Sequence, residues 1–146
     1  MPKSSMEKVV FAFWHLCAEE LSQTSVIWIF YAIETLLGTT PGENRRALHE
    51  RICLLLKPTE KQESEIKKNL GILYDYRSSL VHGGLQIYHP LQFESLDKAV
   101  DEKYQRLMGV AEFGFAILLI ALQTIIGSGW RSPKFTQTLR VEDGGT

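Results

Sequence analysis

The segment Val26–Leu37 reads VIWIFYAIETLL, and Gly38 follows it directly. Its apolar residues recur at helical spacing. Thr24 or Ser25, in the polar stretch before it, is a candidate N-cap, and a glycine directly after a helical run is a common C-terminal cap. The segment therefore predicts an apolar α-helix that ends at Gly38.

Further segments on both sides show the same helical periodicity. They run from a Ser4/Glu7 capping box to about Leu21, then over Glu43–Leu56, Glu60–Val81 and Glu94–Ile126. The last of these is expected to bend near Gly109 or Gly114. Five helices without a persuasive sheet predict an all-α antiparallel bundle. Residues 1–127 form a single helical domain in this interpretation, and residues 128–146 form a loop or partly disordered tail.

Composition excludes several classes of protein. The 146 residues suit one domain, and 16 Lys plus Arg against 17 Asp plus Glu exclude binding of nucleic acid by bulk charge. Cys17 and Cys53 lack CxxC spacing, which predicts buried free thiols in a reducing compartment, and we expect a cytoplasmic location. The apolar run Phe115–Leu122 is short for a membrane span of roughly 20 residues. A buried helix is preferred there, and a membrane-associated helical protein is a third interpretation.

Two charged residues interrupt apolar helix faces. Arg77 follows Ile66, Leu70 and Leu73 on one stripe, where another leucine would be expected, and Glu34 lies in the apolar face of Val26–Leu37. A guanidinium keeps its charge in a protein, so it needs a carboxylate, a phosphate or a water-filled cleft. We therefore predict that Glu34 and Arg77 pair inside the bundle.

His82 comes five positions after Arg77 and directly before Gly83-Gly84. Five steps rotate a side chain by about 140° around a helix, so the two side chains diverge unless the helix ends there or a second copy supplies the complementary group. Asp75, Ser78 and His82 share one face, where a hydroxyl or carboxylate can orient the imidazole.

The bundle carries more large apolar side chains than a domain of this size can easily cover. Uncovered apolar surface usually means a partner, and self-pairing is the commonest choice. The residues concerned are Phe11, Trp14, Trp28, Phe30, Phe113 and Phe115.

Three stretches of the chain resemble the HEPN superfamily and its Apea-like branch. They are AIETLLG (Ala32–Gly38), RRALHERICLLL (Arg45–Leu56) and YDYRSSLVHGG (Tyr74–Gly84), and the last contains the Arg-x4-His signature at Arg77 and His82. The resemblance covers roughly Ile27 to Leu122.

The resemblance implies a metal-independent endoribonuclease that acts as a homodimer, without a cofactor. Arg77 of both protomers would hold the scissile phosphate, and His82 would act as general base or acid around the ribose 2′-hydroxyl. RNA is the implied substrate because DNA lacks that hydroxyl. A toxin or defence role, with a possible protein antitoxin, is implied by the resemblance alone. Ser78 stands where active members often carry Asn, Asp or His.

Interpretations without catalysis stay open beside this one. The alternative function is a non-catalytic HEPN-like module that dimerises and binds RNA or a nucleotide. Tyr74 and Tyr76 either stack bases or pack in the core, and Arg45 and Arg46 either guide RNA or belong to an ordinary charged surface.

The remaining candidates point away from a metal centre. His15 is predicted to pack in the core or an interface, and His49 to lie on a solvated face. No paired Glu-x-x-His motif is present, and His49-Glu50 lacks the second His of a zinc protease helix, so no metal site is expected.

Overall fold

The computed structural model describes residues 4–39, 45–84, 98–130 and 133–136. In these ranges the chain forms five α-helices and no strand, which confirms the predicted all-α fold. The helices are α1 (Ser5–Ala18), α2 (Ser25–Leu37), α3 (Arg45–Leu56), α4 (Glu60–Val81) and α5 (Lys98–Gly127).

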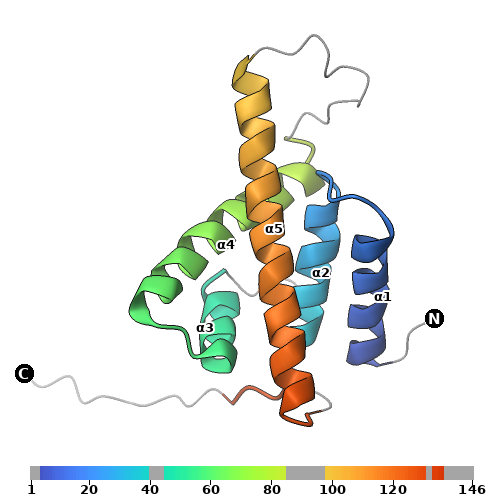
Figure 1. The fold of residues 1–146 in the computed structure, drawn as a ribbon, viewed down its shortest axis with the longest axis vertical. Coiled ribbons are helices and arrows are strands. Elements are labelled where there is room, and N and C mark those ends of the chain that lie inside the picture. The colour runs from blue at the N-terminus through green and yellow to red at the C-terminus, as the bar shows by residue number, and fades with distance from the viewer. Residues whose placement is uncertain (1–3, 40–44, 85–97, 131–132, 137–146) are drawn as a thin grey trace, which may run out of the picture.

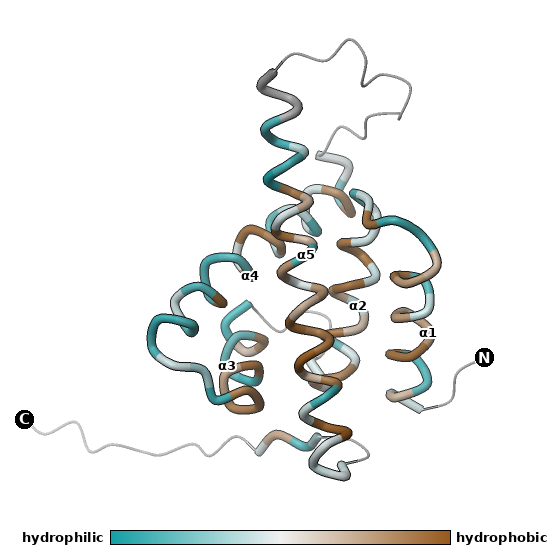
Figure 2. The backbone as a smooth tube through the Cα atoms, in the orientation of Figure 1, coloured by the Kyte–Doolittle hydropathy of each residue, from teal (hydrophilic) through white to brown (hydrophobic). Residues whose placement is uncertain are grey.

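Helix α5 is the central element of the bundle. It packs against α2, α3 and α4, while α1 packs against α2. In Figure 1, α1 and α2 lie on one side of α5 and α3 on the other, while α4 starts beside α3 and crosses α5 so that its end lies near α2. Figure 2 shows that α2 and the second half of α5 are the most apolar parts, and that α4 and the first coloured turns of α5 are more hydrophilic.

One stripe of α5 supplies much of the core. Its spacings of three and four residues place successive side chains on the same helix face. The buried members of this stripe are Leu107, Val110, Ala111, Gly114, Ile117, Leu118, Ala121 and Ile125. This helix is also the one that is long and apolar enough to cross a membrane in the described part of the chain, with 39% of its most apolar window buried inside the bundle.

Gly114 allows α5 to approach its neighbours closely. A Cβ atom there would lie 2.7 Å from Leu73 Cδ2 on α4 and 3.0 Å from Ile29 Cγ2 on α2. Real Cβ atoms essentially never approach heavy atoms under 3.0 Å, so the absence of a side chain lets three helices meet. The helix runs unbroken from Lys98 to Gly127, and Gly114 is a packing residue in it.

The predicted helix ends are largely confirmed. Ser4 and Glu7 form a reciprocal capping box on α1, and Gly38 caps α2 in the left-handed conformation with φ 65°. The predicted end of the first helix near Leu21 is wrong, because Glu19 is already extended and α1 stops at Ala18. The predicted starts of α3 and α5, at Glu43 and Glu94, lie outside the described residues.

One of the two caps predicted for α2 is at the N-cap position, but without the capping hydrogen bond. Thr24 occupies the N-cap position, but its hydroxyl accepts no hydrogen bond from the helix. The Ser25 hydroxyl instead accepts a hydrogen bond of 2.8 Å from the backbone N–H of Ser22 and closes the turn between α1 and α2.

The expected surplus of aromatic surface lies mainly on α1. Phe11 is 49% and Trp14 73% exposed, whereas Phe30 is buried. Trp28, Phe113 and Phe115 are partly covered and pack against the core. Of the two settings predicted for His15, the core is wrong, because the residue is exposed and its ring stacks on that of Trp28 with centroids 4.4 Å apart. Its place in an interface stays a prediction.

Candidate functional site at the end of helix α4

Arg77 and Glu34 form the predicted ion pair. Arg77 follows Ile66, Leu70 and Leu73 along the buried stripe of α4, and Glu34 follows the buried Ile33 on α2. Arg77 Nη2 lies 3.8 Å from Glu34 Oε2, with the two side chains 33% and 30% exposed. The pair therefore lies at the edge of the bundle, and the prediction that it lies inside is wrong.

The Glu34 carboxyl is held in a partly dry environment. Burial raises its pKa above the ordinary value of 4.5, and the nearby Arg77 guanidinium offsets part of that rise. Because 3.8 Å exceeds hydrogen-bonding distance, the attraction to Glu34 uses none of the five N–H donors of Arg77. The guanidinium is thus positioned by charge and keeps donors for an anion.

His82 is the residue at which α4 ends. Its backbone N–H donates to the Ser78 carbonyl at 3.0 Å, and the Gly84 N–H donates to the Ser79 carbonyl at 2.8 Å. Gly83 has φ 70°, a conformation that glycine adopts without strain, and it turns the chain out of the helix. The predicted helix end is confirmed, and the His82 side chain is exposed there.

The structure shows no polar interaction between Arg77 and His82 within the described part of one chain. Among the described residues, Arg77 has its ion pair with Glu34, and no hydrogen bond or ion pair joins it to His82. The roughly 140° between positions five apart accounts for this separation. Asp75 is exposed on the same helix, and Ser78 is half-buried.

The two predicted base-stacking tyrosines serve the core. The Tyr74 ring meets the buried Phe30 edge-on, with centroids 6.0 Å apart. Tyr74 and Tyr76 are both partly buried and pack against the hydrophobic core. The predicted core packing is confirmed for both residues, and base stacking stays a prediction.

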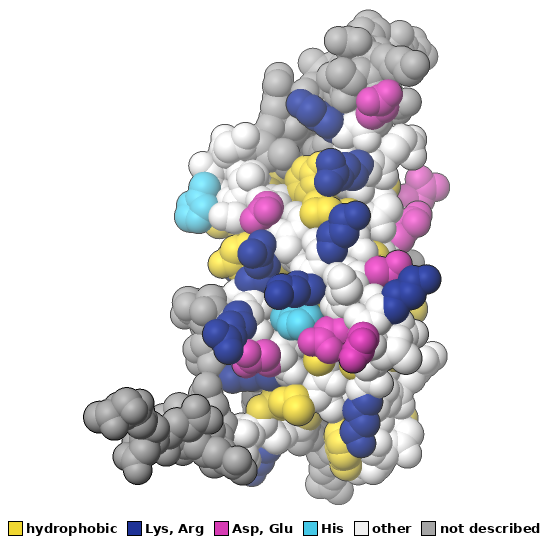
Figure 3. Space-filling view, turned by 90° about the vertical axis from the view of Figure 1, so that its left-hand side faces the viewer, with side chains coloured by type: hydrophobic (Ala, Val, Ile, Leu, Met, Phe, Trp, Pro, Cys, Tyr) yellow, Lys and Arg dark blue, Asp and Glu magenta, His cyan; other side chains and the backbone are white. Residues whose placement is uncertain are grey.

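The two predicted RNA-guiding arginines lie at the start of α3. Arg46 Nε donates to Glu50 Oε1 at 2.7 Å in an exposed pair of neighbouring helix turns, which is typical of a charged helix surface. The Arg45 side chain extends over Gly71 of α4. A Cβ atom at Gly71 would lie 3.1 Å from Arg45 Nη1. Figure 3, which views the α3 and α4 side, shows basic and acidic side chains interspersed there.

A second polar cluster was missed by the sequence analysis. His49 and Cys53 on α3 and Glu63 on α4 place their side-chain ligand atoms within 4.8 Å of one another. His49 is half-buried, so the prediction of a solvated face is wrong. The prediction of buried thiols is wrong for Cys17, which is exposed, and Cys53 is half-buried. The available signal was the spacing of four between His49 and Cys53, which puts both on one helix face.

Comparisons with protein-family models, with curated proteins and with solved structures found no match to this chain. The chemistry of the site is that of a fixed cation and an exposed imidazole near the end of one helix. A guanidinium can bind a phosphate, and an imidazole can transfer a proton near neutral pH.

Proposed function

We propose that the chain is a metal-independent endoribonuclease of HEPN type that works as a homodimer. The observation that carries the proposal is the partly exposed Arg77, held 3.8 Å from Glu34 near the helix end that exposes His82. A structural arginine would direct its donors to its partner. Here the 3.8 Å separation is longer than a hydrogen bond, so the guanidinium can still donate to a phosphate.

The proposed reaction uses the substrate's own nucleophile. The ribose 2′-oxygen attacks the adjacent phosphorus, and the bond from phosphorus to the 5′-oxygen breaks. One imidazole accepts the 2′-hydroxyl proton, and a second donates a proton to the departing 5′-oxygen. Arg77 stabilises the charge that builds on the phosphoryl oxygens. The products are a 2′,3′-cyclic phosphate and a 5′-hydroxyl, and no metal ion takes part.

A second copy of the chain is required for this reaction because it needs two imidazoles. The exposed surface of α2 favours such pairing beside Arg77. Ile27 and Tyr31 are each 40% exposed, and Glu34 follows them at the spacing of one helix face. An apolar surface that continues into the Glu34–Arg77 pair supports a two-fold contact that joins two such pairs in one cleft.

The wider biological setting belongs to the same proposal. RNA as substrate and an exposed free thiol at Cys17 favour a cytoplasmic, reducing location. A toxin or defence role, restrained by a protein antitoxin, would fit an RNase that needs no cofactor. Asp75 and Ser78 would orient His82, and Arg45 would contribute positive charge along the RNA path.

The test is cleavage of mixed RNA by the purified full chain in EDTA. We expect Arg77→Ala and His82→Ala to lower the rate at least about 100-fold, in line with the loss of a charge-stabilising or proton-transferring group. Lys68→Ala removes an exposed charge from the same helix and is the control that retains activity. Thermal melting of each variant checks that loss of the Glu34 partner has not unfolded the protein.

Ser78 favours one second candidate function, the non-catalytic RNA- or nucleotide-binding module. A hydroxyl beside Arg77 is a weaker partner for proton transfer than a carboxylate or imidazole. RNA binding that Arg77→Ala abolishes, without cleavage by the wild type, would support this module and contradict the enzyme. Absence of both binding and cleavage would contradict both.

A further inference from the structure

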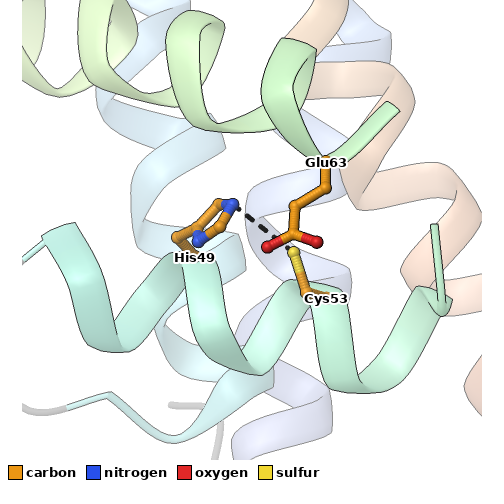
Figure 4. A group of neighbouring side chains, drawn as sticks. All are labelled: His49, Cys53 and Glu63. Atoms are coloured by element: carbon orange, nitrogen blue, oxygen red, sulfur yellow. Dashed lines mark hydrogen bonds between the residues drawn. The ribbon is translucent and has the colours of Figure 1, made fainter. Parts of the chain in front are cut away.

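Helices α3 and α4 bring three metal-ligating side chains together at the end of α4 opposite Arg77. Figure 4 shows His49 and Cys53 projecting from adjacent turns of α3, with Glu63 reaching toward them from the first turn of α4. His49 Nε2 lies 3.4 Å from Cys53 Sγ, and all three ligand atoms lie within 4.8 Å of one another. Fourteen positions separate Glu63 from Arg77, or about 21 Å along the helix, so the cluster is distinct from the proposed RNase site.

The spacing of these atoms matches that of a tetrahedral metal site. Ligands at about 2.0–2.3 Å from a zinc ion lie about 3.3–3.8 Å from one another. The imidazole and thiol already have this separation. Glu63 is exposed at a helix end, so a small rotamer change brings its carboxylate to the same distance.

The chemistry of the cluster selects the ion. A thiol, an imidazole and a carboxylate together suit zinc and related divalent transition metals, whereas magnesium and calcium prefer oxygen ligands alone. We propose that His49, Cys53 and Glu63 bind a zinc ion at three tetrahedral positions, with the fourth position open to water. The ion would fasten α3 to the start of α4.

The surroundings of Cys53 do not favour a catalytic thiol. A nucleophilic cysteine needs a low pKa. Burial raises the pKa of the Cys53 thiol, and the negative charge of Glu63 raises it further. A divalent cation reverses this balance, because it favours the thiolate and neutralises the carboxylate.

The backbone between the two helices is compatible with a clamp at this point. Lys57 directly follows α3 and has φ 49°, a left-handed conformation that few residues other than glycine adopt. Its N–H donates to the Cys53 carbonyl at 2.9 Å, so the last helical hydrogen bond of α3 ends on the ligand residue. An ion bound across the turn would stabilise the two helices by mass action, since the unfolded chain lacks the assembled site.

The experiment titrates the metal-stripped full chain with Co²⁺ and then displaces it with Zn²⁺. We expect one Co²⁺ per chain, with the absorption of a tetrahedral site and a thiolate-to-cobalt charge-transfer band. Cys53→Ser should abolish that band. His49→Gln and Glu63→Gln should weaken binding by more than the roughly tenfold to hundredfold that loss of an outer-shell partner costs. Cys17→Ser, His15→Gln and Glu60→Gln are matched controls that keep full affinity.

A second measurement does not depend on the ligand variants folding. In a Cys17→Ser background, Zn²⁺ should slow alkylation of Cys53 by a maleimide and raise the melting temperature. Binding that survives Cys53→Ser, or alkylation unaffected by Zn²⁺, would overturn the site. Neither result depends on RNA cleavage in EDTA, so the two proposals fail separately.

Discussion

Glu34 and Arg77 show how one ion pair can position a cation without fully engaging it. Their charged atoms are 3.8 Å apart, and each side chain is about one-third exposed. Exposed pairs of this kind contribute little to stability, with a median near 0–1 kcal/mol. The cost of desolvating the Glu34 carboxylate exceeds its attraction to Arg77, which is why the pKa of Glu34 rises. The pair is therefore better suited to placing a guanidinium than to holding the fold together.

Replacement of Glu34 by Gln tests that balance. Because the pKa of Glu34 is higher in the folded state than its ordinary value of 4.5, the carboxyl stabilises the fold fully only below that pH. This contribution is lost as the pH rises through the folded-state pKa. The free energy of unfolding of the wild type, relative to Glu34→Gln, should thus fall as the pH rises from 4 to 7 in urea titrations.

This prediction has a control variant and an outcome that would contradict it. Glu112→Gln removes an exposed carboxylate from α5 and should give no such trend relative to the wild type. A wild-type advantage that grows with pH would mean that the attraction to Arg77 exceeds the cost of burial, and would contradict the assignment.

At the scale of elements, helix ends were largely predictable and helix crossings were not. The capping box at Ser4 and the glycines at Gly38 and Gly83 act through local backbone groups, so their signals are local in sequence. A bend was predicted at Gly114 because a glycine weakens the helix that contains it. Its role as a contact with α2 and α4 depends on residues far away in the chain.

Substitutions at two glycines of α5 test how closely this helix packs against α2 and α4. Gly114→Ala would push a methyl group to 2.7 Å from Leu73 Cδ2 in a close-packed core, and should cost about 1–3 kcal/mol of unfolding free energy. Gly109 lies on the same helix, and a Cβ atom there would meet nothing within 4 Å. Gly109→Ala should therefore raise the free energy of unfolding by about 0.5–1 kcal/mol through helix propensity. Urea unfolding of both variants measures the contrast. Equal effects of the two substitutions would show that the crossing tolerates a side chain.

The candidate sites show the same limit of sequence reasoning. The Glu34–Arg77 pair was predictable because each charge interrupts an apolar stripe on its own helix. The His49–Cys53–Glu63 cluster was not, because Glu63 comes from the next helix and only the packing of α3 on α4 brings it near. The contact between the Tyr74 and Phe30 rings could not be predicted either, because a tyrosine near a helix end is compatible with the core or the surface.

At the scale of the whole molecule, two exposed apolar surfaces remain on the α1 and α2 side. One lies on α2 at Ile27 and Tyr31, beside Glu34. The other lies on the outer face of α1, where Val10, Phe13 and Trp14 border a hollow of about 350 Å³. Of these two surfaces, the one on α2 borders the Glu34–Arg77 pair, so the proposed composite cleft depends on which surface the dimer uses.

Two charge substitutions distinguish these surfaces. Tyr31→Glu puts a carboxylate into the α2 surface and beside Glu34, so desolvation and like-charge repulsion should shift the chain toward a monomer and abolish RNA cleavage together. Trp14→Glu removes the most exposed aromatic side chain of α1, at 73% exposure, and should leave both properties intact. Sedimentation equilibrium and RNA cleavage on the same samples measure the two outcomes. A monomer produced by Trp14→Glu with a dimeric Tyr31→Glu would place the interface on α1, where a shared Arg77 cleft cannot form.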